Sequence, residues 1–474
     1  MQDIAPRYHP QEASVEAHRC LYCFDAPCIM ACPTGIDIPG FIKKIATGNL
    51  VGSARVILES NILGASCARV CPTEVLCEGA CVMLDRDEKP IKIGRLQRYA
   101  TDAFGEQKAN PFLKKMKPNG KKVALVGGGP ASLGCAAELV RLGYQTTVFE
   151  KDMEPGGLNR YGIAYYKMPP EVVQREVKLI RDLGVEFRTQ TEVGKDVPVE
   201  KLRKEYDAVF LGVGLGRTHR LGIPGEEKGG VVEALEFIRL IHTKPLHEIS
   251  VGKRVAVIGC GNTAIDAVTQ AKRLGAKEAI ILYRRGEENM SAYPYEYQLA
   301  KKDGCGFIFH TAPVEVLGDK RVTGLRMIRT RTGKDGKAEI VPGSEFEEPF
   351  DMVIKALGQE KQTSIWKKLI PELKFDVAGR IECDRRTGQT SVAKVFSGGD
   401  AVNGGREVVN AVADGKKAAH GIHAMLSGKP VSGPLQASRL GHRDGAKGSG
   451  FLQPIRVPDL EAAYNRERNG KLHG

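Results

Sequence analysis

Two segments of the chain constrain its fold more than any other feature. Each is a short apolar stretch that runs directly into a glycine turn: KKVALVGGGP at 121–130 and KRVAVIGCGN at 253–262. Each turn precedes a helix-like stretch and a second apolar stretch, QTTVFEK or EAIILYRR. A strand, a glycine turn, a helix and a parallel strand make one dinucleotide-binding unit. The sequence therefore predicts an α/β fold with two Rossmann-like domains.

The first turn has the residues that FAD binding requires. A tight turn favours glycine at its first position, and a glycine two residues later lets the backbone approach a pyrophosphate at a helix N-terminus. Serine replaces the usual third glycine and is small enough for close packing of helix and strand. An acidic residue at the end of the next strand can accept hydrogen bonds from a ribose. We predict FAD contacts at Gly127, Gly129, Pro130, Ala131, Ser132, Glu150 and Gly157.

The second turn matches the same fingerprint, and we predict that Gly259, Gly261, Asn262 and Thr263 bind a nicotinamide nucleotide. The strand that follows ends in Arg284 and Arg285, where NAD sites usually place an acidic residue. Guanidinium groups at this point can hold a 2′-phosphate through charge-assisted hydrogen bonds. The pair therefore favours NADP(H) over NAD(H), although two exposed arginines that bind no ligand would give the same sequence pattern.

Later segments predict that the nicotinamide domain is inserted in the FAD domain. FSGGDAVNGG places Gly399 and Asp400 between a strand and a helix-like stretch, where they can contact a flavin. DAVFLGVGLG and DMVIKALGQ are typical of strands that connect the two domains. We predict an FAD domain at 116–245 and 355–430, a nicotinamide domain at 246–354 and an extended tail at 431–474.

Eight of the twelve cysteines lie between Cys20 and Cys81 and predict a metal region. They form two runs of four cysteines, each with a Cys-Pro step, and short spacings let thiolates converge on one [4Fe–4S] cube. Zinc remains an alternative, because CxxC alone is also typical of zinc sites. Apolar residues recur every three or four positions between the runs. Residues 1–115 are therefore predicted to form an all-α domain with two [4Fe–4S] clusters.

Composition argues against two classes of partner. The net charge of +13 comes from lysines and arginines spread along the chain, and only 6% of residues are aromatic, so we expect no nucleic acid. No apolar run reaches the roughly 18–20 residues that span a bilayer. The first residues lack the apolar core of a signal peptide. We expect no membrane partner and a cytoplasmic location.

The chain resembles the glutamate synthase small-subunit family in the broad sense. That family includes the NADPH-oxidising half of dihydropyrimidine dehydrogenase and the large subunit of transhydrogenating ferredoxin oxidoreductases. The resemblance covers residues 15–430 and is strongest in NILGASCARVCPTEVLCEGAC and IKIGRLQRYATDAF. Two details resemble the dihydropyrimidine dehydrogenase branch: Gln97, 16 residues after Cys81, and Ser132 in the segment GPAS.

The resemblance implies a crossed set of cluster ligands. One cluster would be held by Cys20, Cys23, Cys28 and Cys81, and the other by Cys32, Cys71, Cys77 and Gln97. Cys67 would be a bystander. An amide in place of a thiolate removes one negative charge near the cluster, which should raise its potential.

The resemblance also implies an electron-input subunit of dihydropyrimidine dehydrogenase, an oxidoreductase acting on CH–CH bonds. NAD(P)H would reduce FAD, and the clusters would carry electrons onward. The chain has no room for an FMN barrel, so we expect a hetero-oligomer. The partner would contain FMN and further iron–sulfur clusters and would reduce uracil or thymine to the 5,6-dihydro product. No catalytic side chain is expected here. Alternatives are a glutamate synthase small subunit, a ferredoxin-linked NAD(P)H oxidoreductase subunit, or a non-enzymatic zinc-binding module.

Overall fold

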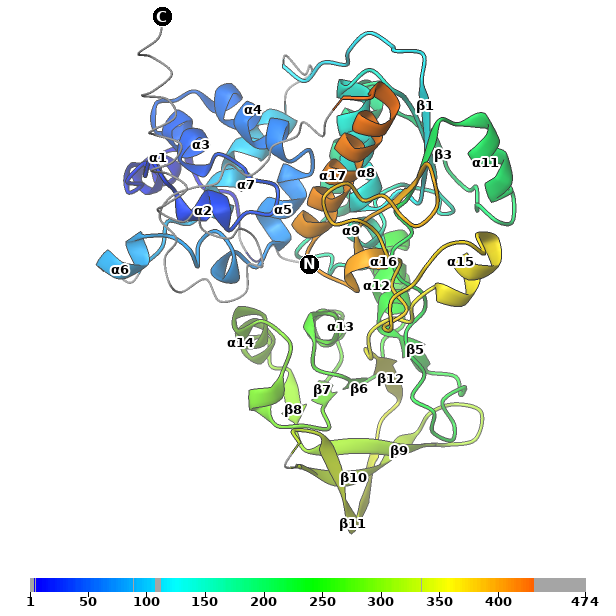
Figure 1. The fold of residues 1–474 in the computed structure, drawn as a ribbon. Helices are drawn as coiled ribbons and strands as arrows, with labels where there is room; N and C mark the ends of the chain where they lie inside the picture. Colours follow the sequence, from blue (N-terminus) through cyan, green and yellow to red (C-terminus); the bar gives the residue numbers. More distant parts are fainter. Residues whose placement is uncertain (1–3, 5, 88, 107–111, 334, 430–474) are drawn as a thin grey trace, which may run out of the picture.

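The structure, a computed structural model, describes residues 4, 6–87, 89–106, 112–333 and 335–429 of the 474-residue chain. The predicted tail at 431–474 lies outside the described residues. A helical part, coloured blue in Figure 1, lies beside an α/β part formed by two separate parallel sheets. Within the described residues, no helix combines the length and the apolar character needed to cross a membrane.

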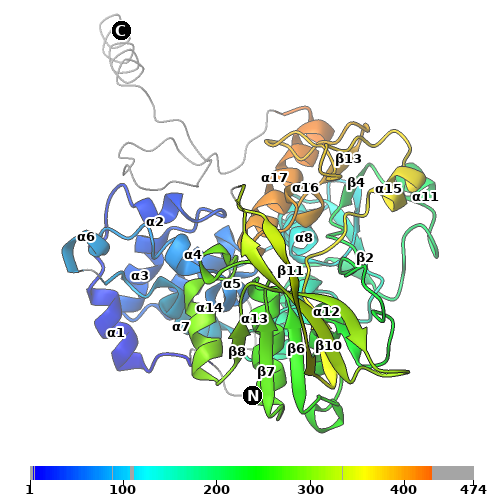
Figure 2. The same cartoon turned by 90° about the horizontal axis from the view of Figure 1, so that it is seen from below.

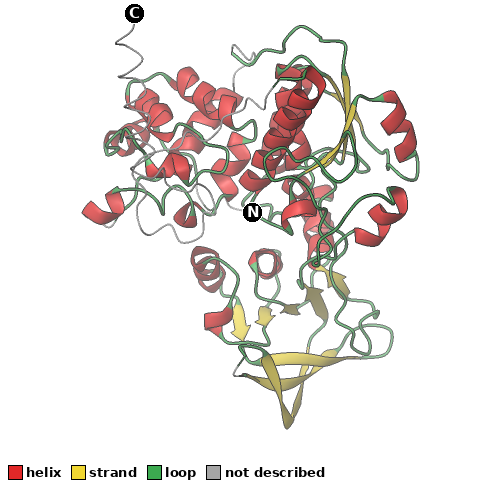
Figure 3. Cartoon of the chain, viewed as in Figure 1, coloured by secondary structure: helices red, strands yellow, loops and turns green. Residues whose placement is uncertain are grey.

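The N-terminal part is built from helices, as Figure 3 shows. Side-chain caps start two of these helices. Asp37 accepts a hydrogen bond from the Gly40 N–H (3.0 Å), and Asn49 accepts one from the Gly52 N–H (2.8 Å). The elements are α1 (Pro10–His18), α2 (Pro27–Met30), α3 (Ile38–Ala46), α4 (Leu50–Ser60), α5 (Gly64–Val70), the 3₁₀ helix η1 (Thr73–Val75), α6 (Met83–Asp87) and α7 (Ile93–Gly105). The predicted all-α domain is confirmed.

The first sheet contains five parallel strands in the order β13-β4-β1-β2-β3. Its strands are β1 (Lys122–Val126), β2 (Gln145–Phe149), β3 (Glu186–Arg188), β4 (Ala208–Leu211) and β13 (Val395–Ser397). Its helices are α8 (Pro130–Arg141), α9 (Leu158–Tyr161), α10 (Pro170–Asp182), α11 (Val199–Glu205), α15 (Thr363–Leu369), α16 (Asp400–Asn403) and α17 (Val408–Ser427). The helices α8 and α17 pack tightly against each other, which joins the two ends of the domain.

The second sheet also has five parallel strands, in the order β5-β12-β6-β7-β8. Its strands are β5 (Val231–Glu233), β6 (Arg254–Ile258), β7 (Glu278–Leu282), β8 (Gly306–Ile308) and β12 (Met352–Lys355). Its helices are α12 (Ala234–Thr243), η2 (Leu246–Glu248), α13 (Asn262–Arg273), η3 (Glu287–Asn289) and α14 (Pro294–Lys302). The chain leaves the first sheet after β4 and returns at β13, so the predicted insertion of one dinucleotide domain in the other is confirmed.

Strand pairing places the start of the inserted domain earlier than the sequence suggested. We expected 116–245 to belong to the first domain, but β5 pairs with β12, with Val231 opposite Val353. The helix α12 packs on this second sheet as well. The inserted domain therefore includes β5, α12 and β12, and its boundaries differ from 246 and 354.

An antiparallel sheet of three strands covers one face of the second sheet. Figure 2 shows β10 (Gly324–Thr332) and β11 (Ala338–Pro349) in front of the second sheet, and β9 (Thr311–Leu317) completes the layer in the order β11-β10-β9. Leu325 and Met327 of β10 are buried against Ala256 and Val353 of the second sheet. This layer was not predicted from the sequence.

Candidate electron-transfer site

The first glycine turn lies between β1 and α8 and has the shape of a pyrophosphate cradle. Gly127 has a φ of +86°, and a Cβ there would lie 2.6 Å from the Gly212 carbonyl oxygen. Gly129 is the N-cap of α8, and Pro130 is its first residue. A Cβ built on Gly129 has only the Gly157 Cα within 4 Å, at 3.9 Å. The space beside the helix N-terminus therefore remains open to an anion.

Glu150 follows β2 and binds the backbone of this turn. Its Oε2 accepts a hydrogen bond from the Gly128 N–H (2.6 Å), and its Oε1 accepts one from the Asp152 N–H (2.8 Å). The side chain is buried, and burial raises its pKa. Each carboxylate oxygen keeps a second lone pair. Glu150 can thus shape the glycine turn and accept a ribose hydroxyl, although only the second role was expected from the sequence.

The predicted flavin residues Gly399 and Asp400 lie beside the same turn. Gly399 has a φ of +72°, and a Cβ there would lie 2.9 Å from the Ala131 Cβ. Burial raises the pKa of Asp400, whose Oδ1 accepts from the Arg406 N–H (3.2 Å). Sequence analysis missed Asp414 on α17, which accepts a hydrogen bond from the Gly399 N–H (3.2 Å). Its helical position carried no motif that could have revealed it.

Ser132 fills the position of the third glycine on α8. It is fully buried, and a Cβ on Gly212 would lie 2.2 Å from its Oγ. In the part of the chain that the structure describes, this Oγ has no hydrogen-bond partner. The close approach of α8 to the end of β4 agrees with the need for a small residue here.

The second glycine turn lies between β6 and α13. Gly259 has a φ of +125°, and a Cβ there would lie 2.3 Å from the Ala356 carbonyl oxygen. Gly261 is the N-cap of α13, and Asn262 and Thr263 open the helix. The Asn262 Oδ1 accepts a hydrogen bond from the Tyr293 N–H (3.0 Å). This bond ties the turn to the start of α14.

The two arginines lie beyond the carboxyl end of β7, at the same sheet edge as this turn. The Arg284 side chain is exposed and has no hydrogen bond or ion pair to any described residue. Arg285 lies over the Tyr283 ring, with its guanidinium carbon 5.3 Å from the ring centroid. Parallel strands place ligand-binding residues at this edge, so both arginines are suitably located for a 2′-phosphate.

A cavity in the helical domain collects the second set of predicted cluster ligands. It measures about 370 Å³, including space open to solvent, and its lining includes Cys32, Cys71, Cys77 and Gln97. Cys67 lines it too. The Gln97 Nε2 donates to the Gly64 carbonyl oxygen (2.7 Å), so the Oε1 is the amide atom left for the cavity. The residues present fit a cluster with three thiolates and one amide oxygen.

The first set of predicted ligands also comes together. Burial raises the pKa of the Cys28 thiol, and the neighbouring Cys81, Cys20 and Cys23 raise it further. Cys81 thus joins a group that lies more than 50 positions earlier in the sequence. In the ranges that the structure describes, no three His, Cys, Asp or Glu side chains are arranged to hold a single metal ion.

The wall between the cluster cavity and the FAD domain comes from α17. Val409, in the first turn of α17, lines the cavity together with the cysteines and Gln97. It is buried in the hydrophobic core of the helical domain. Asp414, which binds the turn at Gly399, lies on the same helix five residues later. A single helix therefore touches both predicted cofactor sites.

The two dinucleotide domains meet at a buried ion cluster. The Lys167 Nζ lies 2.6 Å from Asp266 Oδ1 on α13 and 2.7 Å from Glu296 Oε1 on α14. All three side chains are buried. Burial alone would lower the pKa of Lys167, but the two carboxylates raise it. Close by, the Tyr293 hydroxyl donates to Glu407 Oε1 (2.6 Å) at the start of α17.

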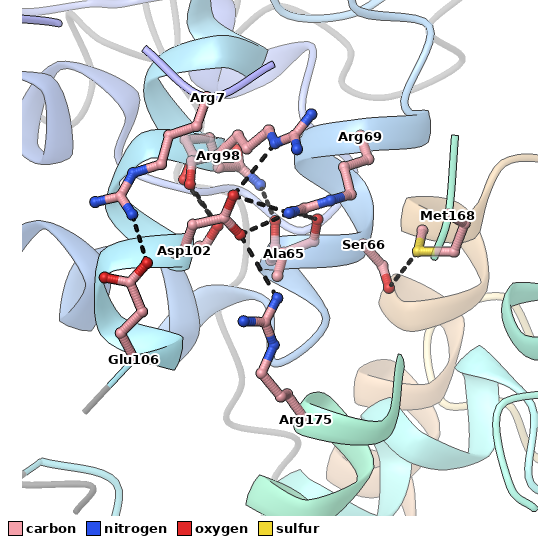
Figure 4. Close-up of polar contacts among 12 residues, drawn as sticks. Arg7, Ala65, Ser66, Arg69, Arg98, Asp102, Glu106, Met168 and Arg175 are labelled. Carbon is pink, nitrogen blue, oxygen red and sulfur yellow. Dashed lines mark hydrogen bonds and ion pairs between the residues drawn. The ribbon is translucent and has the colours of Figure 1, made fainter. Parts of the chain in front are cut away.

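The helical domain docks on α10 of the FAD domain through the polar contacts in Figure 4. Arg69 binds both carboxylate oxygens of Asp102 (2.7 and 2.8 Å), and Arg175 of α10 lies 3.9 Å from the same carboxylate. The Ser66 N–H donates to Glu176 Oε1 (2.9 Å), and the Ser66 hydroxyl donates to Glu176 Oε2. Burial raises the pKa of Glu176 to about 7.

We expect Glu176 to make this docking dependent on pH. The pKa of Glu176 is raised in the folded protein. Its contribution to the stability of the fold is therefore complete below the ordinary pKa of a glutamate and is lost as pH rises through about 7. A pKa shift of this size corresponds to roughly 3 kcal/mol in the free energy of unfolding. Glu176→Gln, which resembles the protonated acid, should flatten the fall in thermal unfolding midpoint between pH 5.5 and 8. An unchanged pH dependence in the variant would contradict this assignment.

Comparisons with known proteins agree with both halves of the structure. Residues 1–109 match the family model described as "Dihydroprymidine dehydrogenase domain II, 4Fe-4S cluster". Residues 121–415 match the model described as "Pyridine nucleotide-disulphide oxidoreductase". The chain belongs to the pyridine nucleotide-disulphide oxidoreductase family. It is an NAD(P)H-linked flavin and iron–sulfur electron-transfer protein, and the predictions of FAD and [4Fe–4S] cofactors are confirmed.

Several relatives share nearly the whole length of the chain. The glutamate synthase [NADPH] small chain of Escherichia coli (strain K12) is 39% identical, covering 90% of this chain and 93% of the relative. That of Halomonas elongata is 38% identical, covering 89% and 92%. The NAD-dependent dihydropyrimidine dehydrogenase subunit PreT of Escherichia coli O157:H7 is 35% identical, covering 90% and 98%.

Solved structures share the dinucleotide-binding fold. Mycobacterium tuberculosis FprA in complex with NADPH aligns with a TM-score of 0.54 at 21% identity, covering 67% of this chain and 88% of FprA. The thioredoxin reductase of T. acidophilum aligns with a TM-score of 0.52 at 22% identity, covering 65% of this chain and 99% of the reductase. At these identities the likeness concerns the fold alone.

Proposed function

We propose that the chain is the electron-input subunit of a dihydropyrimidine dehydrogenase. NAD(P)H binds at the second glycine turn and FAD at the first. Gly127, Gly129 and Glu150 would hold FAD, which would supply hydride acceptance and the release of single electrons to the clusters. The partner subunit carries FMN and further clusters and reduces uracil or thymine. A cytoplasmic hetero-oligomer is part of the proposal.

Gln97 is the observation that carries this proposal. It lines the cavity with Cys32, Cys71 and Cys77, and its Nε2 is occupied by the Gly64 carbonyl oxygen. An amide oxygen in a ligand set otherwise made of thiolates resembles the dihydropyrimidine dehydrogenase branch. We assign the other cluster to Cys20, Cys23, Cys28 and Cys81. The description of the family model for residues 1–109 and the relative PreT support the same branch.

We also propose that the nucleotide is NADP(H), because Arg284 is exposed at the edge of the second turn. Arg284→Ala should raise the KM for NADPH about 10- to 100-fold, since a hydrogen bond to a charged group contributes about 1.5–3 kcal/mol. The KM for NADH should stay the same, because NADH has no 2′-phosphate. Steady-state reduction of an artificial acceptor measures both values. An equal rise for both nucleotides would remove Arg284 from the phosphate site and favour NAD(H), which the name of PreT carries.

A glutamate synthase small subunit is the second candidate. Two small chains of glutamate synthase are 38% and 39% identical to this chain, compared with 35% for PreT. In this case the partner would form glutamate from glutamine and 2-oxoglutarate. The chain itself would perform the same electron input, so the two candidates differ only in the acceptor.

Reconstitution with each class of partner distinguishes the two candidates. The purified chain is mixed with an FMN-containing pyrimidine-reducing subunit or with a glutamate synthase large subunit, and NADPH and NADH oxidation is followed. Stimulation by uracil with the first partner supports the proposal. Stimulation by glutamine and 2-oxoglutarate with the second partner, and none by uracil with the first, contradicts it.

A further inference from the structure

The cavity of the second cluster holds one donor more than a cube needs. Four irons require four protein ligands, and Cys32, Cys71, Cys77 and Gln97 supply them in the assignment above. Cys67 lines the same cavity and has only 3% of its surface exposed. A buried thiol thus lies beside the cluster site without a place in the ligand set.

Cys67 lies next to one of the assigned ligands, Cys71. It lies one helical turn before Cys71, whose N–H donates to the Cys67 carbonyl oxygen (3.1 Å). Side chains four residues apart on a helix are neighbours, so the Cys67 and Cys71 side chains lie on the same face of α5. The four assigned ligands already fill the four corners of the cube, so Cys67 is placed beside a ligand and outside the ligand set.

Asn61 makes the sulfur of Cys67 a hydrogen-bond acceptor. Its Oδ1 accepts a hydrogen bond from the Leu63 N–H (3.0 Å), which orients the amide. Its Nδ2 then donates to the Cys67 Sγ (3.2 Å). Asn61 is fully buried, so water does not compete for either bond. With its sulfur accepting from Asn61, the Cys67 thiol keeps its S–H for a neighbour.

We propose that Cys67 is a positioning residue that donates its S–H to the sulfur of Cys71 and raises the reduction potential of the second cluster. Hydrogen bonds to the sulfurs are among the factors that set cluster potentials. Such a bond stabilises the extra negative charge of the reduced cluster. The inference rests on the cluster assignment and is independent of the partner that receives the electrons.

Cys67→Ala and Cys67→Ser test the proposal in the full-length chain with its cofactors. Iron and acid-labile sulfide per chain are measured, and the midpoint potential of each cluster is followed by EPR during a redox titration. Alanine should keep the full iron content and shift one midpoint to a lower value. Serine restores a donor and should keep that midpoint near the wild-type value. Cys305→Ala, a buried cysteine of the second sheet domain, is the matched control.

Two results would overturn the proposal. Loss of iron in Cys67→Ala, with the EPR signal of a three-iron cluster, would make Cys67 a ligand. Full iron content with unchanged midpoint potentials would show that Cys67 does not affect the potential of the cluster. Neither result depends on uracil reduction, so a failure here is distinguishable from a failure of the proposed function.

Discussion

Replacing Lys167 by methionine should destabilise the junction between the two dinucleotide domains by about 3–5 kcal/mol. Methionine keeps the length of the side chain but leaves Asp266 and Glu296 buried without their cation. Breaking a buried ion cluster by removing one partner typically costs this much. We expect the thermal unfolding midpoint to fall by roughly 10 °C. The reduction of FAD by NADPH should also slow, because the nicotinamide domain is no longer held in place.

The controls separate this effect from a general loss of charge. Lys178→Met breaks an exposed pair with Asp182 and should leave both measurements unchanged. Combining Lys167→Met with Asp266→Asn and Glu296→Gln removes the unpaired charges and should recover much of the loss. A Lys167→Met protein as stable as the wild type would show that the ion cluster does not hold the domains together.

Gly415→Ala should abolish FAD binding by forcing two helices apart. A Cβ at this position of α17 would lie 1.9 Å from the Ala131 carbonyl oxygen and 2.9 Å from the Cys135 backbone nitrogen. These are backbone atoms of α8, so no side chain can move aside. Overpacking costs about 1–3 kcal/mol or more, and here it displaces the helix start that cradles the pyrophosphate. The FAD content of the purified variant, measured by absorbance, should drop at least tenfold.

Gly105→Ala is the matched control for this substitution. Gly105 also lies in a helix, at the end of α7, and the atoms nearest to a Cβ there belong to the Arg175 side chain, at 3.5 Å or more. This is an ordinary contact, and alanine favours helix more than glycine does. The control should keep its FAD and its unfolding midpoint. Normal FAD content in Gly415→Ala would refute the requirement for close packing of α8 and α17.

The elements that depend on local sequence were predictable. Both glycine turns could be read directly, because a positive φ at Gly127 or Gly259 excludes most other residues. The crossed grouping of the cysteines came from family resemblance, since Cys81 reaches Cys28 only through the folding of the helices between them. Spacing alone could not have given it.

The elements that depend on distant partners were not predictable. The short strand β5 is defined by its pairing with β12, which lies about 120 residues later. The strand β11 is charged and largely exposed, and it becomes a strand by pairing with β10. Glu176 has the sequence context of an ordinary surface helix, and only the docking of Ser66 against it reveals a buried carboxyl group.

The placement of Val409 in the wall of the cluster cavity has a consequence for how the protein is assembled. The cysteines of that cavity are synthesised more than 300 residues before Val409. The helix that carries Val409 follows β13, the last strand of the first sheet, in the chain. The cavity therefore gains this part of its wall only after most of the chain has been synthesised.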